Sequence, residues 1–289
     1  MRTFLCLMVC ALAFVAWLDV RPSEPALTGS GAVAPSPTGL ANGSTSGPAA
    51  PSSGSTASNE IIGVAAAIDD ASDRLVRHAT GPSPRAEPPA CRRADETTEP
   101  GAGGDLALAV LDTALRLPPG YAPRDLVPVS LARMPGGGLV RRVIIGDLRA
   151  LAAAARAAGV PLTAHSAYRS EASQTVVYHQ WVRGSGVDVA RRSSARPGHS
   201  EHQLGTTLDV GAVSAAPWAT DFAATRVGRW LVAHAVGFGF VVSYPKGASR
   251  ATCYVAEPWH IRWVGREPAA AVKASGLTLR EWLWGHRRG

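Results

Sequence analysis

The first third of this 289-residue chain contains almost no segment that can join a hydrophobic core, and this limits where a folded domain can lie. Residues 20–59 are mainly Pro, Ser, Gly, Thr and Ala, with almost no large apolar side chain. Such a stretch cannot bury enough surface to offset the entropy that ordering costs. We therefore expect residues 20–104 to be mostly a disordered linker, with a short helix near residues 60–78, where apolar residues recur at helical spacing.

A short apolar segment precedes the linker. Met1 and Arg2 give a positively charged start, and residues 4–18 form an apolar run. The run is shorter than the roughly 20 residues that a membrane-spanning helix needs, so we expect residues 1–19 to be an export signal. Cleavage and retention as an anchor both stay open, because no A-x-A cleavage site comes directly after the apolar run. The protein is then periplasmic, bound to the cell envelope or extracellular, and it would touch a membrane only through an uncleaved anchor.

The net charge of +7 favours an acidic partner. For an exported protein, that partner is anionic wall polymer or a membrane surface sooner than nucleic acid. The arginines are scattered, and no basic run alternates with aromatic residues, so the sequence does not predict nucleic-acid binding. We expect the protein to be a monomer.

Residues 105–289 alternate apolar segments with clear helix and strand breakers, and they suffice for one sizeable core. The spacing predicts helices at 144–158, 171–183, 221–235 and 279–284, and strands at 162–166, 206–210 and 238–243. Ser170 and Thr278 are the expected N-caps of the second and last helices. Because helices and short strands alternate without a βαβ rhythm, we expect one α+β domain with a small, largely antiparallel sheet flanked by helices.

Two motifs of this domain carry residues suited to metal chemistry. His202 and Asp209 are seven residues apart across a glycine, so a turn can present the imidazole and the next strand the carboxylate. Glu257 and His260 are three residues apart. A catalytic zinc ion takes three protein ligands of these types, and it lowers the pKa of a bound water to about 7. The pattern predicts His202, Asp209 and His260 as ligands and Glu257 as the base that accepts the water's proton.

Arg169 is a candidate for binding an anion. Its planar guanidinium can hold a carboxylate or a developing oxyanion in a two-pronged geometry. It also precedes a predicted helix, whose N-terminus attracts anions. The alternative is an ion pair at the start of that helix.

Two cysteines lie outside the export signal, Cys91 and Cys253. An even pair in an exported chain can form a disulfide, although sequence does not fix pairing. Cys253 as a metal ligand is the alternative. His199 competes with His202 as a ligand, and we assign it to the rim of the site or to a position behind the ligands.

Three stretches of the domain resemble the VanY-type D-alanyl-D-alanine carboxypeptidase family of zinc peptidases. They are Ser-Ala-Tyr-Arg-Ser at 166–170 with Gln174, Ser-x-His-x-x-Gly-x-x-x-Asp at 200–209, and Glu-x-Trp-His at 257–260. The resemblance extends over roughly residues 105–284. It implies a Hedgehog-like α+β fold, with zinc on His202, Asp209 and His260 and with Glu257 as general base.

The same resemblance implies the substrate and the residues that contact it. The expected reaction is removal of the terminal D-alanine from peptidoglycan stem peptides, with Arg169 facing the substrate. Tyr168, Gln174 and Ser200 are the further substrate-binding candidates.

Other activities stay open at this stage. An LD-carboxypeptidase or a peptidoglycan endopeptidase would share the fold, and a non-catalytic module could bind wall peptide with the same fold. Such a module is expected to lose a ligand or Glu257, and this chain keeps them all. Ser243 and Lys246 match the S-x-x-K signature of serine enzymes, but Ser243 comes directly after the strand residues Val241 and Val242 rather than opening a helix, so we reject a serine peptidase.

Overall fold

The computed structural model describes residues 87–101, 104–219 and 221–287. The predicted export signal, most of the predicted linker and the helix expected near residues 60–78 lie outside these ranges. None of the helices within the described ranges combines the length and the apolar character that crossing a bilayer requires.

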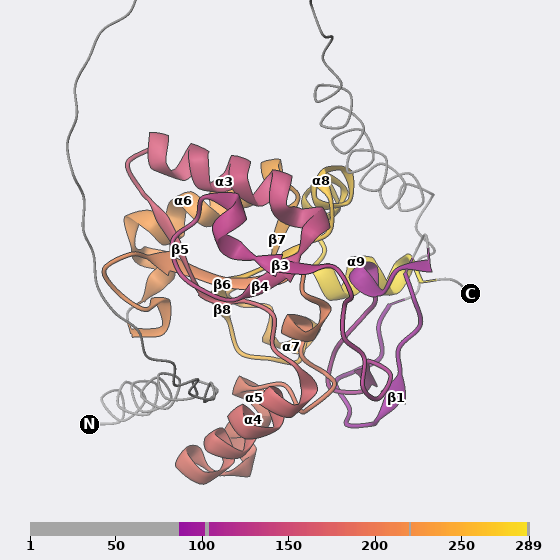
Figure 1. Ribbon diagram of the computed structural model, residues 1–289. Helices are drawn as coiled ribbons and strands as arrows, with labels where there is room; N and C mark the ends of the chain where they lie inside the picture. The colour runs from indigo at the N-terminus through magenta and orange to yellow at the C-terminus, as the bar shows by residue number, and fades with distance from the viewer. Residues whose placement is uncertain (1–86, 102–103, 220, 288–289) are drawn as a thin grey trace, which may run out of the picture.

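A four-stranded antiparallel sheet forms the centre of the domain (Figure 1). Its strand order is β5 (Leu162–Ser166), β6 (Thr207–Ala212), β8 (Glu257–Trp263) and β7 (Phe240–Tyr244). β6 is buried along almost its whole length because it lies between β5 and β8. The expected α+β class with a small, largely antiparallel sheet is therefore confirmed.

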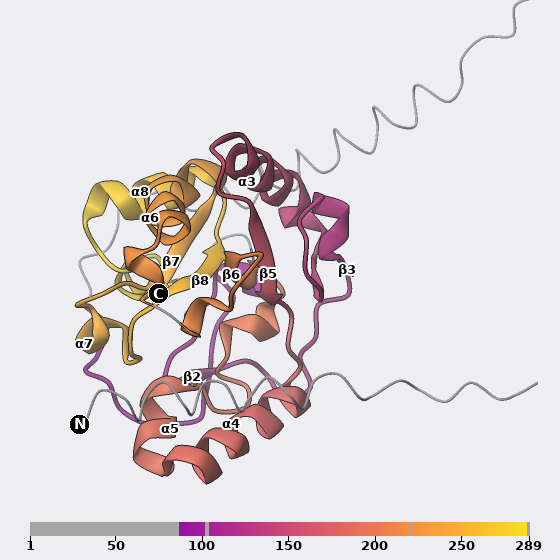
Figure 2. The ribbon, with the colours of Figure 1, turned by 90° about the vertical axis from the view of Figure 1, so that its left-hand side faces the viewer.

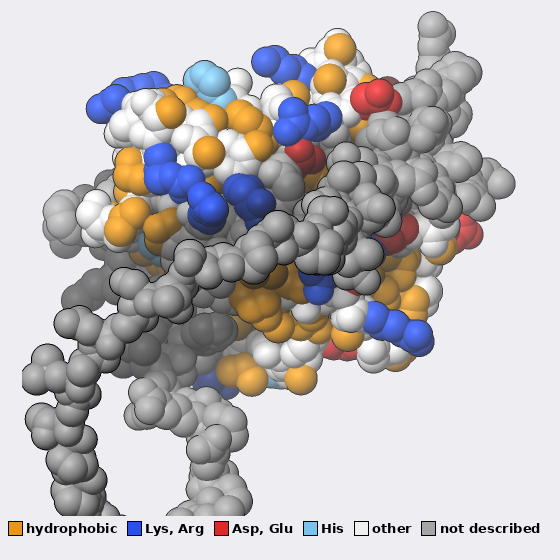
Figure 3. Space-filling model, turned by 45° about the horizontal axis from the view of Figure 1, so that its top comes forward, with side chains coloured by type: hydrophobic (Ala, Val, Ile, Leu, Met, Phe, Trp, Pro, Cys, Tyr) orange, Lys and Arg blue, Asp and Glu red, His pale blue; other side chains and the backbone are white. Residues whose placement is uncertain are grey.

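Helices lie on both sides of the sheet. Figures 1 and 2 both place α3 (Ile145–Ala157), α6 (Arg226–His234) and α8 (Arg266–Ser275) on one side and the paired helices α4 (Glu171–Ser185) and α5 (Val187–Ser193) on the other. The largest core cluster lies between the first group and the sheet, and it includes Leu148, Leu151, Leu208, Ile261 and Trp263. On the face in Figure 3, Lys and Arg side chains occur in several separate places among apolar side chains.

Shorter elements complete the described structure. The remaining strands are β1 (Glu96–Thr97), β2 (Leu115–Arg116), β3 (Leu126–Pro128) and β4 (Leu139–Arg141), and the remaining α-helices are α7 (Ser249–Thr252) and α9 (Leu279–Gly285). Single 3-10 turns occur at η3 (Leu106–Leu108), η4 (Val129–Ala132), η5 (Arg142–Ile144), η6 (Glu201–Leu204), η7 (Pro217–Ala219), η8 (Phe222–Ala224) and η9 (Ala235–Phe238).

Two of the predicted helix starts are confirmed, and one is wrong. The Ser170 side chain accepts a hydrogen bond from the amide of Ser173, and Thr278 forms a capping box with Glu281. The helix expected over residues 221–235 is interrupted, because the Thr225 side chain accepts from the amide of Gly228 and caps α6 there. Residues 222–224 form a separate 3-10 turn instead.

Residues 87–101, which we assigned to the linker, contact the folded domain. β1 pairs with β2 in parallel, and Cys91 forms a disulfide with Cys253, which is 162 residues away. Asp95 forms an ion pair of 2.7 Å with Arg196. The boundary at residue 105 stays a prediction, but these contacts fix the described part of the preceding segment to the domain.

The disulfide should contribute measurably to stability, because it closes a long loop and restricts the unfolded chain. The double variant Cys91→Ser/Cys253→Ser should lose about 2–5 kcal/mol of unfolding free energy in urea denaturation. The wild type in excess reducing agent is the control and should match the variant. A variant as stable as the oxidised wild type would contradict this expectation.

Candidate metal centre

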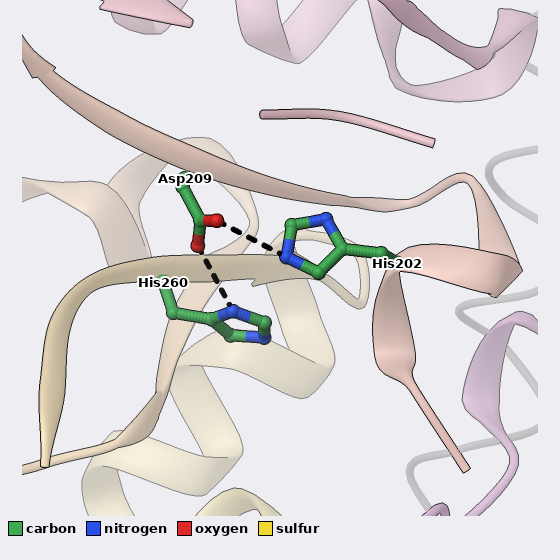
Figure 4. Close-up of side chains that lie close together, drawn as sticks. All are labelled: His202, Asp209 and His260. Atoms are coloured by element: carbon green, nitrogen blue, oxygen red, sulfur yellow. Dashed lines mark hydrogen bonds and ion pairs between the residues drawn. The ribbon is translucent and has the colours of Figure 1, made fainter. Parts of the chain in front are cut away.

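Two neighbouring strands and the turn before them bring His202, Asp209 and His260 together (Figure 4). β6 and β8 are paired so that Asp209 lies directly opposite His260. His202 lies in η6, and the chain then turns at Gly205 with a φ of 72° before β6 begins. A Cβ atom at Gly205 would also lie too close to the side chains of Arg141 and Leu126. Glycine therefore suits this turn because it adopts a positive φ without strain and because it has no side chain to collide with these neighbours.

The three side chains lie close enough together to share a metal ion. The carboxylate oxygens of Asp209 lie 3.3 Å from Nε2 of His202 and 3.1 Å from Nδ1 of His260. One ligand atom from each of the three residues lies within 4.8 Å of the others. Ligand atoms that are about 2.0–2.2 Å from a tetrahedral zinc ion lie roughly 3.3–3.6 Å from one another. Two imidazoles and one carboxylate are also a donor set that zinc accepts.

Each imidazole turns one nitrogen toward this centre and uses the other in a hydrogen bond. Nδ1 of His202 lies 2.7 Å from the carbonyl oxygen of Ala167, so that nitrogen donates and Nε2 faces Asp209. Nε2 of His260 lies 3.0 Å from a carboxylate oxygen of Glu201, which leaves Nδ1 facing Asp209. Metal-binding histidines have this arrangement, because the outer hydrogen bond fixes the tautomer and the ring orientation.

Three carboxylates contact His260 in the centre. Burial alone would lower the pKa of His260, but its hydrogen bonds to Asp209 and Glu201 raise that pKa to about 10. Burial would also raise the pKa of Asp209, yet the neighbouring His202 and His260 hold it well below its usual range. The raised pKa of His260 therefore reports a site whose carboxylates attract a cation.

Glu257 reaches the same centre because β8 is irregular at its start. On a regular strand, residues 257 and 260 would point to opposite faces. The pairing of β7 with β8 shifts register there, since Tyr244 pairs with Glu257 whereas Val242 pairs with Ile261. This irregularity brings a Glu257 oxygen to 3.5 Å from Nδ1 of His260. Burial, with a further contribution from Asp209, raises the pKa of Glu257 to about 7, which suits a group that accepts and returns a proton at neutral pH.

Arg169 lies beside the centre without a partner of its own. Burial lowers its pKa, while the charges of Asp209 and Glu257 oppose that shift. Its Nε is buried without a hydrogen-bond partner, and within the described ranges its side chain makes no ion pair. The ion pair that we considered as the alternative at this helix start is therefore absent from the described structure, and the guanidinium can receive an anion.

The other predicted substrate contacts differ in their burial and hydrogen bonds. Gln174 is buried, and its Nε2 donates to the carbonyl of Ala195 at 2.6 Å, whereas its Oε1 has no partner. Tyr168 is half-buried, and its amide donates to the carbonyl of Leu139. Ser200 is buried at the start of η6, two residues before His202. Their roles in substrate binding stay predictions.

His199 is buried away from the proposed metal ligands, and Cys253 forms the disulfide that was considered from the sequence. His199 is buried, not at a rim, and Nδ1 contacts the carbonyl oxygens of Asp112 and Leu115 while Nε2 contacts Asp95. Both of its nitrogens are therefore engaged away from the metal centre, where they hold residues 95 and 112–115 together. Cys253 is joined to Cys91, so its sulfur is not a metal ligand.

Two charged residues beside the centre, Glu201 and Arg262, were not among the residues predicted from the sequence. Glu201 is 5% exposed and lies between His260 and Arg262, and Arg262 is fully buried. The available signal was a carboxylate directly before His202 and an arginine two residues after His260, on the strand that carries His260. Burial of both charges could not be inferred from these positions alone.

Comparison with known proteins identifies the family. The family model for VanY, D-alanyl-D-alanine carboxypeptidase, matches residues 138–266. The chain is 33% identical to the Bacillus subtilis protein YodJ over 181 residues, which cover 61% of this chain and 66% of that protein. This chain aligns with 35–66% of the length of each of four curated relatives.

Several solved structures are similar to this one. The LD-carboxypeptidase LdcB is 28% identical, with a TM-score of 0.56, over 68% of this chain and 99% of that one. A vancomycin-resistance D,D-pentapeptidase, a VanY variant in complex with Zn(II), is 30% identical, with a TM-score of 0.53, over 62% of this chain and 99% of that one. The chain belongs to the VanY family of D-alanyl-D-alanine carboxypeptidases.

The unpaired guanidinium of Arg169 predicts an unusual response to substitution. Arg169→Met should leave the unfolding free energy of the metal-free protein within about 1 kcal/mol of the wild type, because it removes a desolvated cation that has no ion pair. Arg141 is the matched control, since its guanidinium binds Asp105 at 2.7 Å and Asp125 at 2.9 Å. Arg141→Met should cost on the order of 1–3 kcal/mol in the same urea titration. Equal losses in the two variants would indicate a structural role for Arg169.

Proposed function

We propose that this chain is an exported, zinc-dependent D-alanyl-D-alanine carboxypeptidase that acts on peptidoglycan stem peptides. The observation that carries the proposal is the convergence of His202, Asp209 and His260, with Glu257 3.5 Å from His260. Family membership and the zinc complex of the similar VanY enzyme support it. The net charge of +7 is suited to the anionic cell wall.

In the proposed mechanism, His202 and His260 would hold zinc with the nitrogens that face Asp209, and Asp209 would hold it with a carboxylate oxygen. When bound, zinc would supply Lewis acidity, which polarises a carbonyl group and makes water more acidic. Glu257 takes a proton from the attacking water as the new carbon–oxygen bond forms. It then gives that proton to the amine of the departing D-alanine as the carbon–nitrogen bond breaks.

Arg169 orients the substrate in this proposal. Its unpaired guanidinium receives either the terminal carboxylate of the peptide or the oxygen on which charge develops during attack. Binding the terminal carboxylate would restrict the enzyme to the end of a peptide and so give carboxypeptidase activity. An endopeptidase would have no such carboxylate to bind.

A second candidate is an LD-carboxypeptidase, which removes D-alanine from a tetrapeptide stem. The similarity to LdcB, an LD-carboxypeptidase, supports it. The metal ligands and Glu257 would serve either reaction, because the two substrates differ in the residue before the scissile bond and not in the bond's chemistry.

The products formed from defined muropeptides test the proposal. The purified protein with zinc should convert pentapeptide stems into tetrapeptide stems by removal of one D-alanine, as measured by mass spectrometry. A chelator-treated sample is the control and should be inactive. Faster conversion of tetrapeptide than of pentapeptide stems would favour the LD-carboxypeptidase, and cleavage within the stem would contradict both candidates.

Substitutions should separate metal binding from proton transfer. Glu257→Gln should retain one equivalent of zinc and lose about 10²–10⁴-fold in kcat, because the amide cannot accept the water's proton. His202→Ala should lose both zinc and activity, because it removes a ligand. Zinc content is measured by atomic emission after gel filtration, alongside the muropeptide assay. Full activity in Glu257→Gln would exclude the assigned base.

A further inference from the structure

Glu201 is a buried carboxylate that contacts a proposed metal ligand without being a ligand itself. One of its oxygens lies 3.0 Å from Nε2 of His260, and the other accepts a hydrogen bond of 2.7 Å from NH1 of Arg262. The group that could hold a metal ion contains His202, Asp209 and His260 but not Glu201. The nitrogen of His260 that Glu201 contacts is the one on the far side of the ring from Asp209.

Arg262 fixes Glu201 from the other side. Arg262 is completely buried, and its NH2 donates to the carbonyl oxygens of Ala107 at 2.9 Å and Ala109 at 2.6 Å. Hydrogen bonds on both of its oxygens limit rotation of the Glu201 carboxylate. The two carbonyls belong to a segment that precedes residues 138–266, which match the family model.

We propose that Glu201 is a positioning residue for His260, and this inference rests on the metal site of the proposed function. An imidazole has two nitrogens, and a metal needs the unprotonated one. By accepting the Nε2 proton, Glu201 fixes the tautomer in which Nδ1 is free and turned toward Asp209. A carboxylate behind a histidine also makes that histidine a stronger metal ligand. His202 is held by the carbonyl of Ala167, a neutral acceptor, so His260 is the ligand with the charged support.

A purely structural role is the competing explanation. Glu201 could serve only to neutralise Arg262, because an unpaired buried charge is costly. That role predicts a less stable metal-free protein whose metal site is unchanged. The positioning role predicts a changed metal site, so metal affinity and the spectrum of the bound metal distinguish the two.

Glu201→Gln is the direct test, because it keeps the size of the side chain. His260 and Arg262 contact different oxygens of Glu201, and the amide replaces one of these oxygens with an NH2 group that cannot accept. If its NH2 group turns toward His260, it favours the tautomer with the proton on Nδ1, the wrong one for metal binding. Zinc affinity, measured by competition with a chromogenic chelator, should fall about 10–100-fold. The visible absorption of the cobalt(II)-substituted protein should change as well.

Glu96→Gln is the matched control. Glu96 also pairs with an arginine, Arg92, at 2.6 Å, but both side chains are about half exposed. Its zinc affinity and cobalt spectrum should equal those of the wild type. If Glu201→Gln fails to fold, the double variant Glu201→Leu/Arg262→Met removes both buried charges together, and the same loss of zinc affinity is expected.

The outcomes separate this inference from the proposed function. A folded Glu201 variant with zinc affinity within about threefold of the wild type and an unchanged cobalt spectrum would overturn the positioning role. The proposed function would then stand. A wild-type protein that binds no zinc at these residues would overturn the proposed function itself, and the inference with it.

Discussion

The antiparallel pairing of β6 with β8 is the constraint on which the site depends. It sets Asp209 directly opposite His260, and a slip of one residue would move one of the two side chains to the other face of the sheet. Register is strongly fixed because Leu208 and Ile261, which flank these residues, are fully buried in the core. The hydrophobic core thus holds two proposed ligands in place, and the turn at Gly205 adds the third.

Buried charge extends the site well beyond the metal. A continuous series of contacts runs from Asp209 through His260, Glu201 and Arg262 to the carbonyls of residues 107 and 109. Each charged group in it has an opposite charge or a carbonyl beside it, as burial demands. Residues 107 and 109, which precede the segment that matches the family model, therefore contact the charged groups behind the centre. Two further contacts attach the chain before residue 138 to the domain: the disulfide of Cys91 with Cys253, and the hydrogen bonds of His199 with Asp95 and Asp112.

The sequence predicts those features that depend on residues close together in the chain, such as helix caps. Residue type and spacing predict Ser170 and Thr278 as caps, and the combined motifs together with the resemblance to the VanY family predict the three proposed ligands as a group. The irregularity in β8 that brings Glu257 and His260 to one side depends on pairing with β7, which spacing does not reveal. The hydrogen bond between Glu201 and Arg262 joins residues that are 61 positions apart in the sequence. The cap at Thr225 was missed because the apolar spacing continues through residues 221–235 and predicts one uninterrupted helix. These features follow from tertiary contacts.

The zinc environment is the central claim, and X-ray absorption at the zinc K-edge of the loaded, full-length protein tests it most directly. The account predicts two imidazole nitrogens and one carboxylate oxygen at about 2.0–2.2 Å, with no sulfur in the first shell. A sulfur scatterer at about 2.3 Å, or a spectrum with fewer than two imidazoles, would contradict it.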